Sequence, residues 1–349
     1  MKKITIKDVA REAGVSVTLV SFVMNAKKGP DGRLDCPVNA ETAKRVLSVA
    51  RKLGYRRNVA AASLRSGRSN TIAVIPTDIS NKFFAGISRY IEDKAYAYGY
   101  TVLFGSSDES ADRLDSVMDT VLAYNIDGII VAPVAGGEAA IQKAIDVNVP
   151  VVLLDRDIES MDSVGKVLLN DVEAGRMATE LLLRNGCKSV EMVSYKLDIS
   201  SLQEREEGYK QTMKEKGLEA KVHYTDYTNA ENDLLDIIKD VVSRGVDGLF
   251  IPTYSLSAWA MSAMRKLNVV SPDDLALVAF DESDVYKLYS TTVAHIVQPL
   301  KELGEKSVDL LHAMIENLPC QKTVILNPAL VEGGSAEKNN SPNEALYLT

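Results

Sequence analysis

Two stretches of the sequence repeat one pattern, and this repeat restricts the fold more than any other feature. Residues 125–131 read Asn-Ile-Asp-Gly-Ile-Ile-Val, and residues 245–251 read Gly-Val-Asp-Gly-Leu-Phe-Ile. Each is followed by a helical pattern and then by an apolar strand ending in aspartate, with offsets of 120 and 126 residues between the copies. Strands that alternate with helices are typical of parallel sheets. The repeat therefore predicts an α/β body with two related lobes.

Aspartates follow several of the predicted strands directly. Asp78, Asp155 and Asp281 each come just after an apolar segment of this kind. Parallel α/β sheets bind ligands beyond the carboxyl ends of their strands, so in two facing lobes these aspartates would meet at one cleft. Each aspartate taken alone also fits a helix cap or a surface ion pair. The predicted strands are residues 71–76, 128–131, 149–154, 248–251 and 275–280.

The charges divide the chain near residue 68. Residues 1–68 hold 15 Lys and Arg against 5 Asp and Glu, which gives a net charge of +10. The whole chain holds 40 against 48, so residues 69–349 hold 25 against 43, a net charge of −18. A basic head on an acidic body indicates a polyanionic partner for the head alone. The alternative, a solvated charged tail, would lack the regular apolar spacing that this head carries.

The basic head has the pattern of three short helices. Thr5 and Ser16 are suited to cap the first two, and Gly14 supplies the turn between them. Two short helices across a glycine turn form the unit that places its second helix in the major groove of DNA. Periodicity alone fits an ordinary helical hairpin about equally well. The expected helices cover residues 6–13, 17–25 and 40–53.

Composition excludes several classes of protein. A chain of 349 residues suggests two or three domains. Neither a long apolar run nor an apolar stretch behind the N-terminal lysines occurs, so no membrane span or secretory signal is expected. The three scattered cysteines have no disulfide or metal spacing and fit a reducing cytoplasm. Without a phosphate loop, a metal-spaced His/Cys set or a nucleophile elbow, we expect no enzyme activity, metal or cofactor.

Longer motifs in the head and in the body resemble those of a known protein family. Residues 4–25, ITIKDVAREAGVSVTLVSFVMN, closely resemble the DNA-binding head of the LacI/GalR family of bacterial transcription regulators. The family's body in turn resembles periplasmic sugar-binding proteins. The resemblance thus implies a helix-turn-helix head, a hinge helix and a two-lobed α/β core with parallel sheets. It continues through residues 41–58, 61–75 and 78–84, resumes at 274–284 and 298–304, and ends near 334.

The resemblance also implies a division of the chain. The polar tail has no leucine heptad, so a dimer is expected rather than a tetramer held together by the tail. We expect the helix-turn-helix domain at 1–57, the hinge helix and linker at 58–69, the core at 70–334 and the tail at 335–349. Within the core, lobe 1 is expected at about 70–165 and 294–325, and lobe 2 at about 166–293 and 326–334.

Matching positions imply DNA contacts for the second helix. Val17 and Thr18 would meet base edges, Thr18 through its hydroxyl or methyl group and Val17 by apolar contact alone. Phe22 stands where the family commonly has a guanine-reading Arg, so it would touch a thymine methyl or pack against the next loop. Phosphate contacts, which fix register without reading sequence, are implied for Thr5, Ser16, Ser21 and Asn25.

Two further segments bear on DNA binding. In the hinge, Leu64 would be an apolar wedge in the minor groove, lined by Ala61 and Arg65. The alternative for the hinge is a plain linker. The loop over residues 26–37 is longer than usual in the family and would add phosphate contacts or be a solvated turn.

For the cleft, the resemblance adds residues to the strand-end aspartates. Carboxylates and a fork-shaped guanidinium suit a polyhydroxylated ligand, and aromatic faces suit its apolar side. Thr253 and Tyr254 stand where the family usually has Asn-Asp, which leaves the ligand open. A sugar or sugar derivative is expected first and a nucleobase second. The implied ligand-binding set is Asp78, Ser80, Asn81, Phe84, Asp155, Arg156, Arg205, Thr253, Tyr254 and Asp281.

Together these features predict a cytoplasmic, sequence-specific regulator, most simply a repressor. Its partners would be a pseudo-palindromic double-stranded DNA operator, a second copy of the chain and a small effector, with no membrane. Two alternatives remain: a regulator controlled by a protein partner through a degenerate cleft, and a carbohydrate-binding protein without a regulatory role.

Replacing Leu64 with Ala tests the wedge. We expect specific operator binding to weaken far more than non-specific binding, because only a kinked specific site uses the apolar wedge. Titrations against operator and against random DNA at one salt concentration would measure both losses. Equal losses on the two DNAs would contradict the wedge.

Overall fold

The turn glycine and the capping side chains set the helix ends in the basic head. The computed structural model describes residues 4–28, 34–55 and 67–338. Gly14 ends the first helix with a φ of 64°, a left-handed conformation that suits glycine. Ser16 caps the second helix by accepting a hydrogen bond from the Leu19 backbone N–H at 3.2 Å. The helices are α1 (Ile6–Ala13), α2 (Val17–Asn25) and α3 (Ala40–Lys52).

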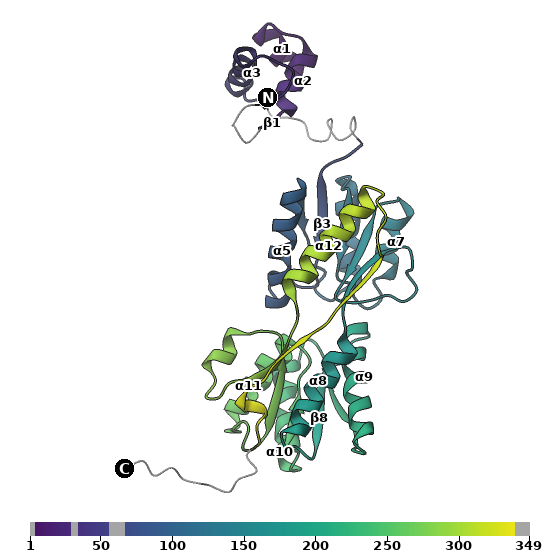
Figure 1. Ribbon diagram of the computed structural model, residues 1–349, viewed down its shortest axis with the longest axis vertical. Helices are drawn as coiled ribbons and strands as arrows, with labels where there is room; N and C mark the ends of the chain where they lie inside the picture. Colours follow the sequence, from purple (N-terminus) through teal and green to yellow (C-terminus); the bar gives the residue numbers. More distant parts are fainter. Residues whose placement is uncertain (1–3, 29–33, 56–66, 339–349) are drawn as a thin grey trace, which may run out of the picture. The chain divides into compact units, whose positions relative to one another are not determined.

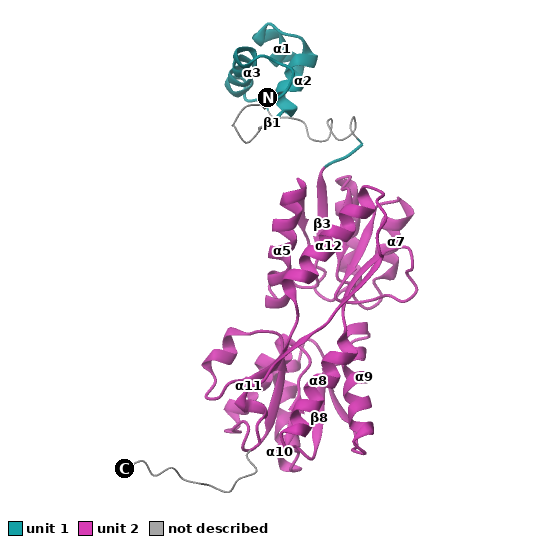
Figure 2. Cartoon of the chain, in the orientation of Figure 1, with its two compact units in different colours: residues 1–69 teal, residues 70–349 magenta. Residues whose placement is uncertain are grey.

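These helices share one small apolar core in the first compact unit, residues 1–69 (Figure 2). Val9 of α1, Val20 of α2 and Val46 of α3 are fully buried in it. The loop between α2 and α3 contains a short antiparallel hairpin of β1 (Lys27–Lys28) and β2 (Leu34–Asp35). The wedge and groove residues predicted for the hinge, Ala61, Leu64 and Arg65, lie outside the described residues.

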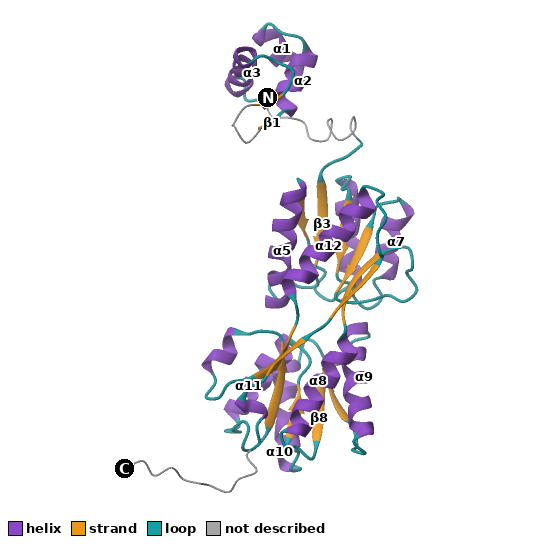
Figure 3. Ribbon diagram, in the orientation of Figure 1, coloured by secondary structure: helices purple, strands orange, loops and turns teal. Residues whose placement is uncertain are grey.

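The predicted apolar strands form the centre of a second unit, residues 70–349. Its first sheet is parallel throughout, in the order β13-β7-β6-β5-β3-β4. Helices α5 and α12 cover one face and α6 and α7 the other, so the central strands β3, β5, β6 and β7 are buried on both sides (Figures 1 and 3). The elements are β3 (Thr71–Ile75), α5 (Lys82–Tyr98), β4 (Thr101–Phe104), α6 (Ala111–Ala123), β5 (Gly128–Val131), α7 (Glu138–Asp146), β6 (Val151–Leu154), β7 (Gly165–Leu169), α12 (Leu300–Ile315) and β13 (Thr323–Leu326).

The second sheet repeats this plan. Its order is β14-β12-β11-β10-β8-β9, and only β14 runs antiparallel. Helices α8 and α9 cover one face, and α10 and α11 the other. The elements are α8 (Asp171–Arg184), β8 (Val190–Tyr195), α9 (Ser200–Glu215), β9 (Lys221–Thr225), α10 (Ala230–Ser243), β10 (Gly248–Phe250), α11 (Tyr254–Lys266), β11 (Ala276–Phe280), η1 (Asp284–Leu288), β12 (Ala294–Val297), β14 (Ala329–Val331) and η2 (Gly334–Ala336).

The chain crosses between the two lobes three times. The crossings follow β7, β12 and β13, since each of these strands ends in one sheet and the next element packs in the other lobe. The lobe changes therefore fall a few residues later than the sequence suggested. Strand β7 pairs with β6 and β13 in the first sheet, and β12 pairs with β11 in the second. The hydrogen-bonded neighbours of a strand decide which lobe it belongs to, and the sequence of the strand does not reveal those neighbours.

Two glycines let α8 and α9 cross in close contact. A Cβ on Gly175 of α8 would lie 2.0 Å from the Arg205 carbonyl oxygen, and one on Gly208 of α9 would lie 2.0 Å from that of Val172. Only glycine therefore fits at either position without a shift of backbone. The contact also fixes where α9 presents Arg205.

Substituting Gly208 with Ala should destabilise the second lobe by about 1–3 kcal/mol or more, because the added methyl group has to displace the α8 backbone. Urea unfolding of the full chain would measure the loss. The exposed Gln211→Ala variant on the same helix is the control and should stay within about 0.5 kcal/mol of the parent. A stable Gly208→Ala protein would contradict the close crossing.

Candidate functional site

The exposed face of α2 carries the base-reading positions predicted for the head. Val17 and Phe22 are 40% and 49% exposed, while the opposite face of α2 packs in the core of the head. Thr18 is also exposed. Ser21 accepts a hydrogen bond from the Asn25 side-chain amide at 3.0 Å. Among the described residues of the head, Phe22 is not part of the apolar core.

The first turn of α1 is capped by a local network. The Thr5 backbone N–H and hydroxyl both donate to the Asp8 carboxylate, at 2.9 and 2.7 Å. The Asp8 carboxylate also pairs with Arg11. Thr5 thus lies exposed at the N-terminus of α1, with both of its donors engaged by the Asp8 carboxylate.

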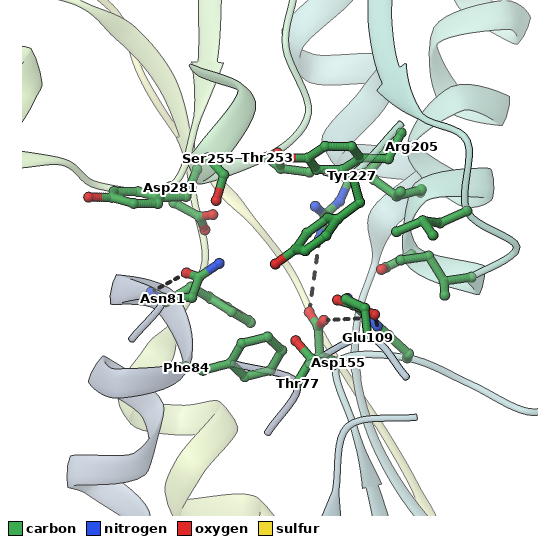
Figure 4. A pocket seen from close by; sticks show the side chains of 18 of the residues that line it. Thr77, Asn81, Phe84, Glu109, Asp155, Arg205, Tyr227, Thr253, Ser255 and Asp281 are labelled. Atoms are coloured by element: carbon green, nitrogen blue, oxygen red, sulfur yellow. Dashed lines mark hydrogen bonds and ion pairs between the residues drawn. The ribbon is translucent and has the colours of Figure 1, made fainter. Parts of the chain in front are cut away.

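A cavity of about 60 Å³ lies between the two lobes at the carboxyl ends of their strands (Figure 4). Loops that follow β3 and β6 supply one wall, and residues at the ends of β8, β10 and β11 supply the facing wall. Its lining is Thr77, Asn81, Phe83, Phe84, Glu109, Asp155, Arg156, Tyr195, Leu197, Ile199, Ser201, Leu202, Arg205, Tyr227, Thr253, Tyr254, Ser255, Asp281 and Gln298.

Arg205 is buried in this wall and held on three sides. Its Nε donates to the Asp171 carboxylate at 2.6 Å, and one terminal nitrogen donates to the Pro252 carbonyl at 2.7 Å. Its guanidinium carbon lies 3.9 Å from the centre of the Phe280 ring, which makes a cation–π contact. The guanidinium therefore has a fixed place, and its second terminal nitrogen lies 4.0 Å from Asp155.

Arg156 is engaged on the opposite wall. Its two terminal nitrogens donate to the two carboxylate oxygens of Glu109 at 2.8 and 2.7 Å, a bidentate pair. One of them also donates to the Pro133 carbonyl at 2.9 Å. Both side chains of the pair are only 9% exposed. The charge of Arg156 is thus largely neutralised within the wall.

Asp155 and Asp281 occupy corresponding places in the two lobes. Both have left-handed backbones, with φ values of 71° and 62°, and both are buried. Asp281 accepts a hydrogen bond from the Gln298 amide at 2.8 Å. Burial raises the pKa of Asp281 to about 6, against the opposing effect of Arg205. Burial likewise raises the pKa of Asp155, opposed by Arg205 and Arg156.

Eight of the ten predicted ligand residues line this cavity, and two do not. Asn81 and Thr253 also cap helices α5 and α11. Asp78 accepts hydrogen bonds from the backbone N–H and the hydroxyl of Ser80, both at 2.7 Å, and neither residue is part of the lining. The eight are Asn81, Phe84, Asp155, Arg156, Arg205, Thr253, Tyr254 and Asp281.

Sequence reasoning missed several residues of the cavity. Tyr195 and Gln298 directly end or follow strands β8 and β12, so the strand-end rule that found Asp155 could have found them. Glu109 and Tyr227 come from loops, and only the fold brings them in. Across residues 4–28, 34–55 and 67–338, no cluster of acidic, His or Cys side chains is suited to a metal. No helix in these ranges is long and apolar enough to cross a membrane.

A helix-turn-helix head on a two-lobed α/β body with a cleft between its lobes defines a class of DNA-binding transcription regulators. Residues 5–58 match the bacterial regulatory proteins of the lacI family, and residues 72–319 match the periplasmic binding protein domain. The chain belongs to the lacI family, which confirms the predicted family, fold class and role as a DNA-binding transcriptional regulator.

Individual relatives agree along nearly the whole chain. The ribose operon repressor of Halalkalibacterium halodurans is 30% identical over 90% of this chain and 91% of its own length. Catabolite control protein A of Priestia megaterium is 28% identical over 94% and 98%. The lac repressor dimer bound to operator and the anti-inducer ONPF has the same fold, with a TM-score of 0.79 at 20% identity over 96% and 99%. Two of these relatives are named as repressors and one as a catabolite control protein.

Replacing Asp281 with Asn should change how stability depends on pH. A buried acid whose pKa lies above its ordinary value binds its proton more tightly in the folded state, so the parent loses stability as pH rises from about 4 to about 6. The Asn variant lacks this titration. Relative to the parent, it should therefore gain up to about 3 kcal/mol across that range.

Urea unfolding of both proteins at pH values from about 4 to about 7 would measure the difference. Asp162→Asn, which removes an exposed carboxylate of lobe 1 outside the cavity, is the control. Its free energy of unfolding should depend on pH in the same way as that of the parent. A constant difference between parent and Asp281→Asn would contradict the pKa assigned to Asp281.

Proposed function

We propose that this chain is a sequence-specific repressor whose operator affinity is set by a small polyhydroxylated molecule between its lobes, a sugar or sugar derivative. The observation that carries the proposal is the meeting of Asp155, Asp281 and Arg205 in one cavity at the strand ends. The recognition helix of the same chain is exposed on a head with a net charge of +10. The name of the ribose operon repressor, a relative across nine-tenths of the chain, supports the sugar class.

In this proposal the head reads DNA through α2. Val17 and Thr18 contact base edges, and Phe22 adds an apolar contact in the major groove. Ala61, Leu64 and Arg65 contact the minor groove. Phosphate contacts come from Thr5, Ser16, Ser21 and Asn25. Because operators of this kind are pseudo-palindromic, the active form is a homodimer with matching two-fold symmetry. This homodimer acts in the cytoplasm.

The ligand would act by changing how the lobes close. A cavity of about 60 Å³ is below the roughly 300 Å³ of ordinary ligand clefts, so a sugar enters only when the lobes separate. Contacts between the lobes include Lys82 with Asp284 at 2.5 Å, the Asp157 backbone N–H with the Ser200 hydroxyl at 2.7 Å, and Arg205 with Asp155 at 4.0 Å. A ligand that binds one arrangement of the lobes more tightly shifts the equilibrium between lobe arrangements toward that one. The altered lobe arrangement then changes DNA binding through the hinge.

The domain division follows from this mechanism. We assign residues 1–57 to DNA binding, 58–69 to the hinge and 70–334 to effector binding and dimerisation, with 335–349 as a tail. The crossings after β7, β12 and β13 supply the joints about which the lobes move.

Selection of genomic fragments by the full-length protein tests the DNA half of the proposal. We expect enrichment of one pseudo-palindromic site. The matched control replaces Val17 and Thr18 with Ala, which should abolish enrichment while salt-sensitive binding to any DNA persists, because phosphate contacts remain. Equal enrichment by both proteins would contradict the prediction that Val17 and Thr18 of α2 read bases.

Thermal unfolding with a panel of metabolites tests the effector half. A ligand at about 100 times its dissociation constant should stabilise the protein by roughly 2.7 kcal/mol. The same ligand should change the amount of selected operator that is bound. Failure of every metabolite, with operator selection intact, would favour control by a protein partner.

A further inference from the structure

Four carboxylic acids and two guanidiniums are buried together where the two lobes meet. None of these six side chains is more than 9% exposed. If all six were charged, four negative and two positive charges would leave a net charge of −2 away from water. Such a surplus is costly, so the cluster favours the binding of a proton. The six are Glu109, Asp155 and Arg156 of lobe 1, and Asp171, Arg205 and Asp281 of lobe 2.

In lobe 1 the acids outnumber the guanidinium by one. Arg156 forms its bidentate pair with Glu109 at 2.8 and 2.7 Å, so this pair has no net charge. The remaining acid, Asp155, lies 3.6 Å from Arg156 Nε, which is longer than a hydrogen bond. Asp155 Oδ1 is buried and accepts no hydrogen bond from any described residue. The charge of Asp155 is therefore stabilised by ion pairs alone, and protonation would remove the cost of its burial.

Lobe 2 has the same excess of one acid, and closure brings the two excesses together. Asp171 accepts a hydrogen bond from Arg205 Nε at 2.6 Å. Asp281 accepts one from the neutral amide of Gln298 at 2.8 Å. Closure then places Asp155 of lobe 1 at 4.0 Å from the Arg205 guanidinium (Figure 4). In the closed arrangement one guanidinium thus faces three buried acids.

The pKa values of the three acids fit this balance of charge. Burial raises the pKa of Asp171 to about 7 and that of Asp281 to about 6, against the opposing effect of Arg205. Burial also raises the pKa of Asp155. The charge of Asp155 adds to the rise at both acids of lobe 2, so the lobes affect each other's titration. The other charged groups that face the three acids are Glu109, Arg156, Glu204 and Arg205.

We propose that closure of the two lobes takes up a proton from water, which the carboxyl groups of Asp155, Asp171 and Asp281 share around Arg205. Because these acids interact, the proton belongs to the cluster rather than to one residue. Opening separates Asp155 from the acids of lobe 2 and returns the proton to water. The closed arrangement is therefore favoured at low pH and is lost as the pH rises through the pKa values of the cluster.

This inference deepens the proposed function, in which the lobe arrangement sets operator affinity. The pH would act on the same equilibrium as the effector. Its test needs no effector, because closure can be measured on the protein alone.

A distance between the lobes reports closure as the pH changes. Gln142→Cys in α7 and Gln211→Cys in α9 place a pair of dyes on exposed sites along the same side of the two lobes (Figure 1). Cys36→Ser and Cys320→Ser remove the two cysteines that are not buried. Single-molecule energy transfer in the labelled full-length protein, diluted into unlabelled protein, gives the ratio of closed to open molecules.

We expect this ratio to fall as the pH rises from about 5 to about 8, by up to about tenfold per pH unit, which is the effect of one proton. The sign follows from the raised pKa values, since the closed arrangement binds the proton more tightly than the open one. A ratio that stays constant, or that increases with pH, would overturn the proposal.

Asp155→Asn separates the shared proton from other titrations of the protein. An amide is a neutral mimic of the protonated acid, and Asn tolerates the φ of 71° at this position. The closed-to-open ratio of this variant should depend on pH much less than that of the parent and should exceed it at about pH 8. Asp162→Asn, which removes an exposed carboxylate outside the cavity, should follow the parent. An Asp155→Asn protein with the parent's pH dependence would also overturn the proposal.

Infrared spectroscopy of the unlabelled parent detects the proton directly. At about pH 6, where exposed carboxyl groups are ionised, the folded protein should show the carbonyl band of a protonated acid. The band should weaken in at least one of the folded variants Asp155→Asn, Asp171→Asn and Asp281→Asn. Absence of the band from the parent would mean that the cluster holds no proton, whereas operator selection and metabolite binding could still succeed. Failure of those two experiments would leave the proton-linked closure standing.

Discussion

The buried guanidinium of Arg205 connects more of the second lobe than any other side chain of the cavity. It joins α9, which carries it, to Asp171 at the start of α8, to the Pro252 carbonyl after β10 and to the Phe280 ring of β11. The close crossing of α8 and α9 at two glycines holds it there. A buried ion pair adds little net stability by itself, but losing one partner leaves an uncompensated charge. The arrangement of strand ends around the cavity therefore depends on this contact.

The regular parts of the fold could be predicted from local sequence. The helices of the head begin at Thr5, Ser16 and Asn39 caps, and Gly128–Val131 forms the strand that its apolar run indicates. The position of Asp155 followed from its place after a strand. Glu109 could not be predicted, because its role comes from a partner 47 residues away in sequence. The lobe changes were misplaced for the same reason, since strand pairing decides them.

The charge division explains how one chain keeps its two tasks apart. The head holds a net charge of +10 and the rest of the chain −18, so the phosphates of DNA attract the one and repel the other. Inside the cavity, by contrast, the carboxylates of Asp155 and Asp281 lie together with the guanidiniums of Arg156 and Arg205. The sign of the net charge thus separates the head, which suits a polyanion, from the acidic body.

The left-handed backbone at Asp155 and Asp281 restricts how such a cavity can diverge during evolution. At φ values of 71° and 62°, Asn, Asp and Gly are tolerated, whereas β-branched and bulky residues are strained. A lineage that changes ligand can therefore exchange a charge for an amide at these positions, but it cannot readily add bulk there. Changes of ligand shape would accumulate instead at Thr253, Tyr254 and Tyr195, whose backbones carry no such restriction.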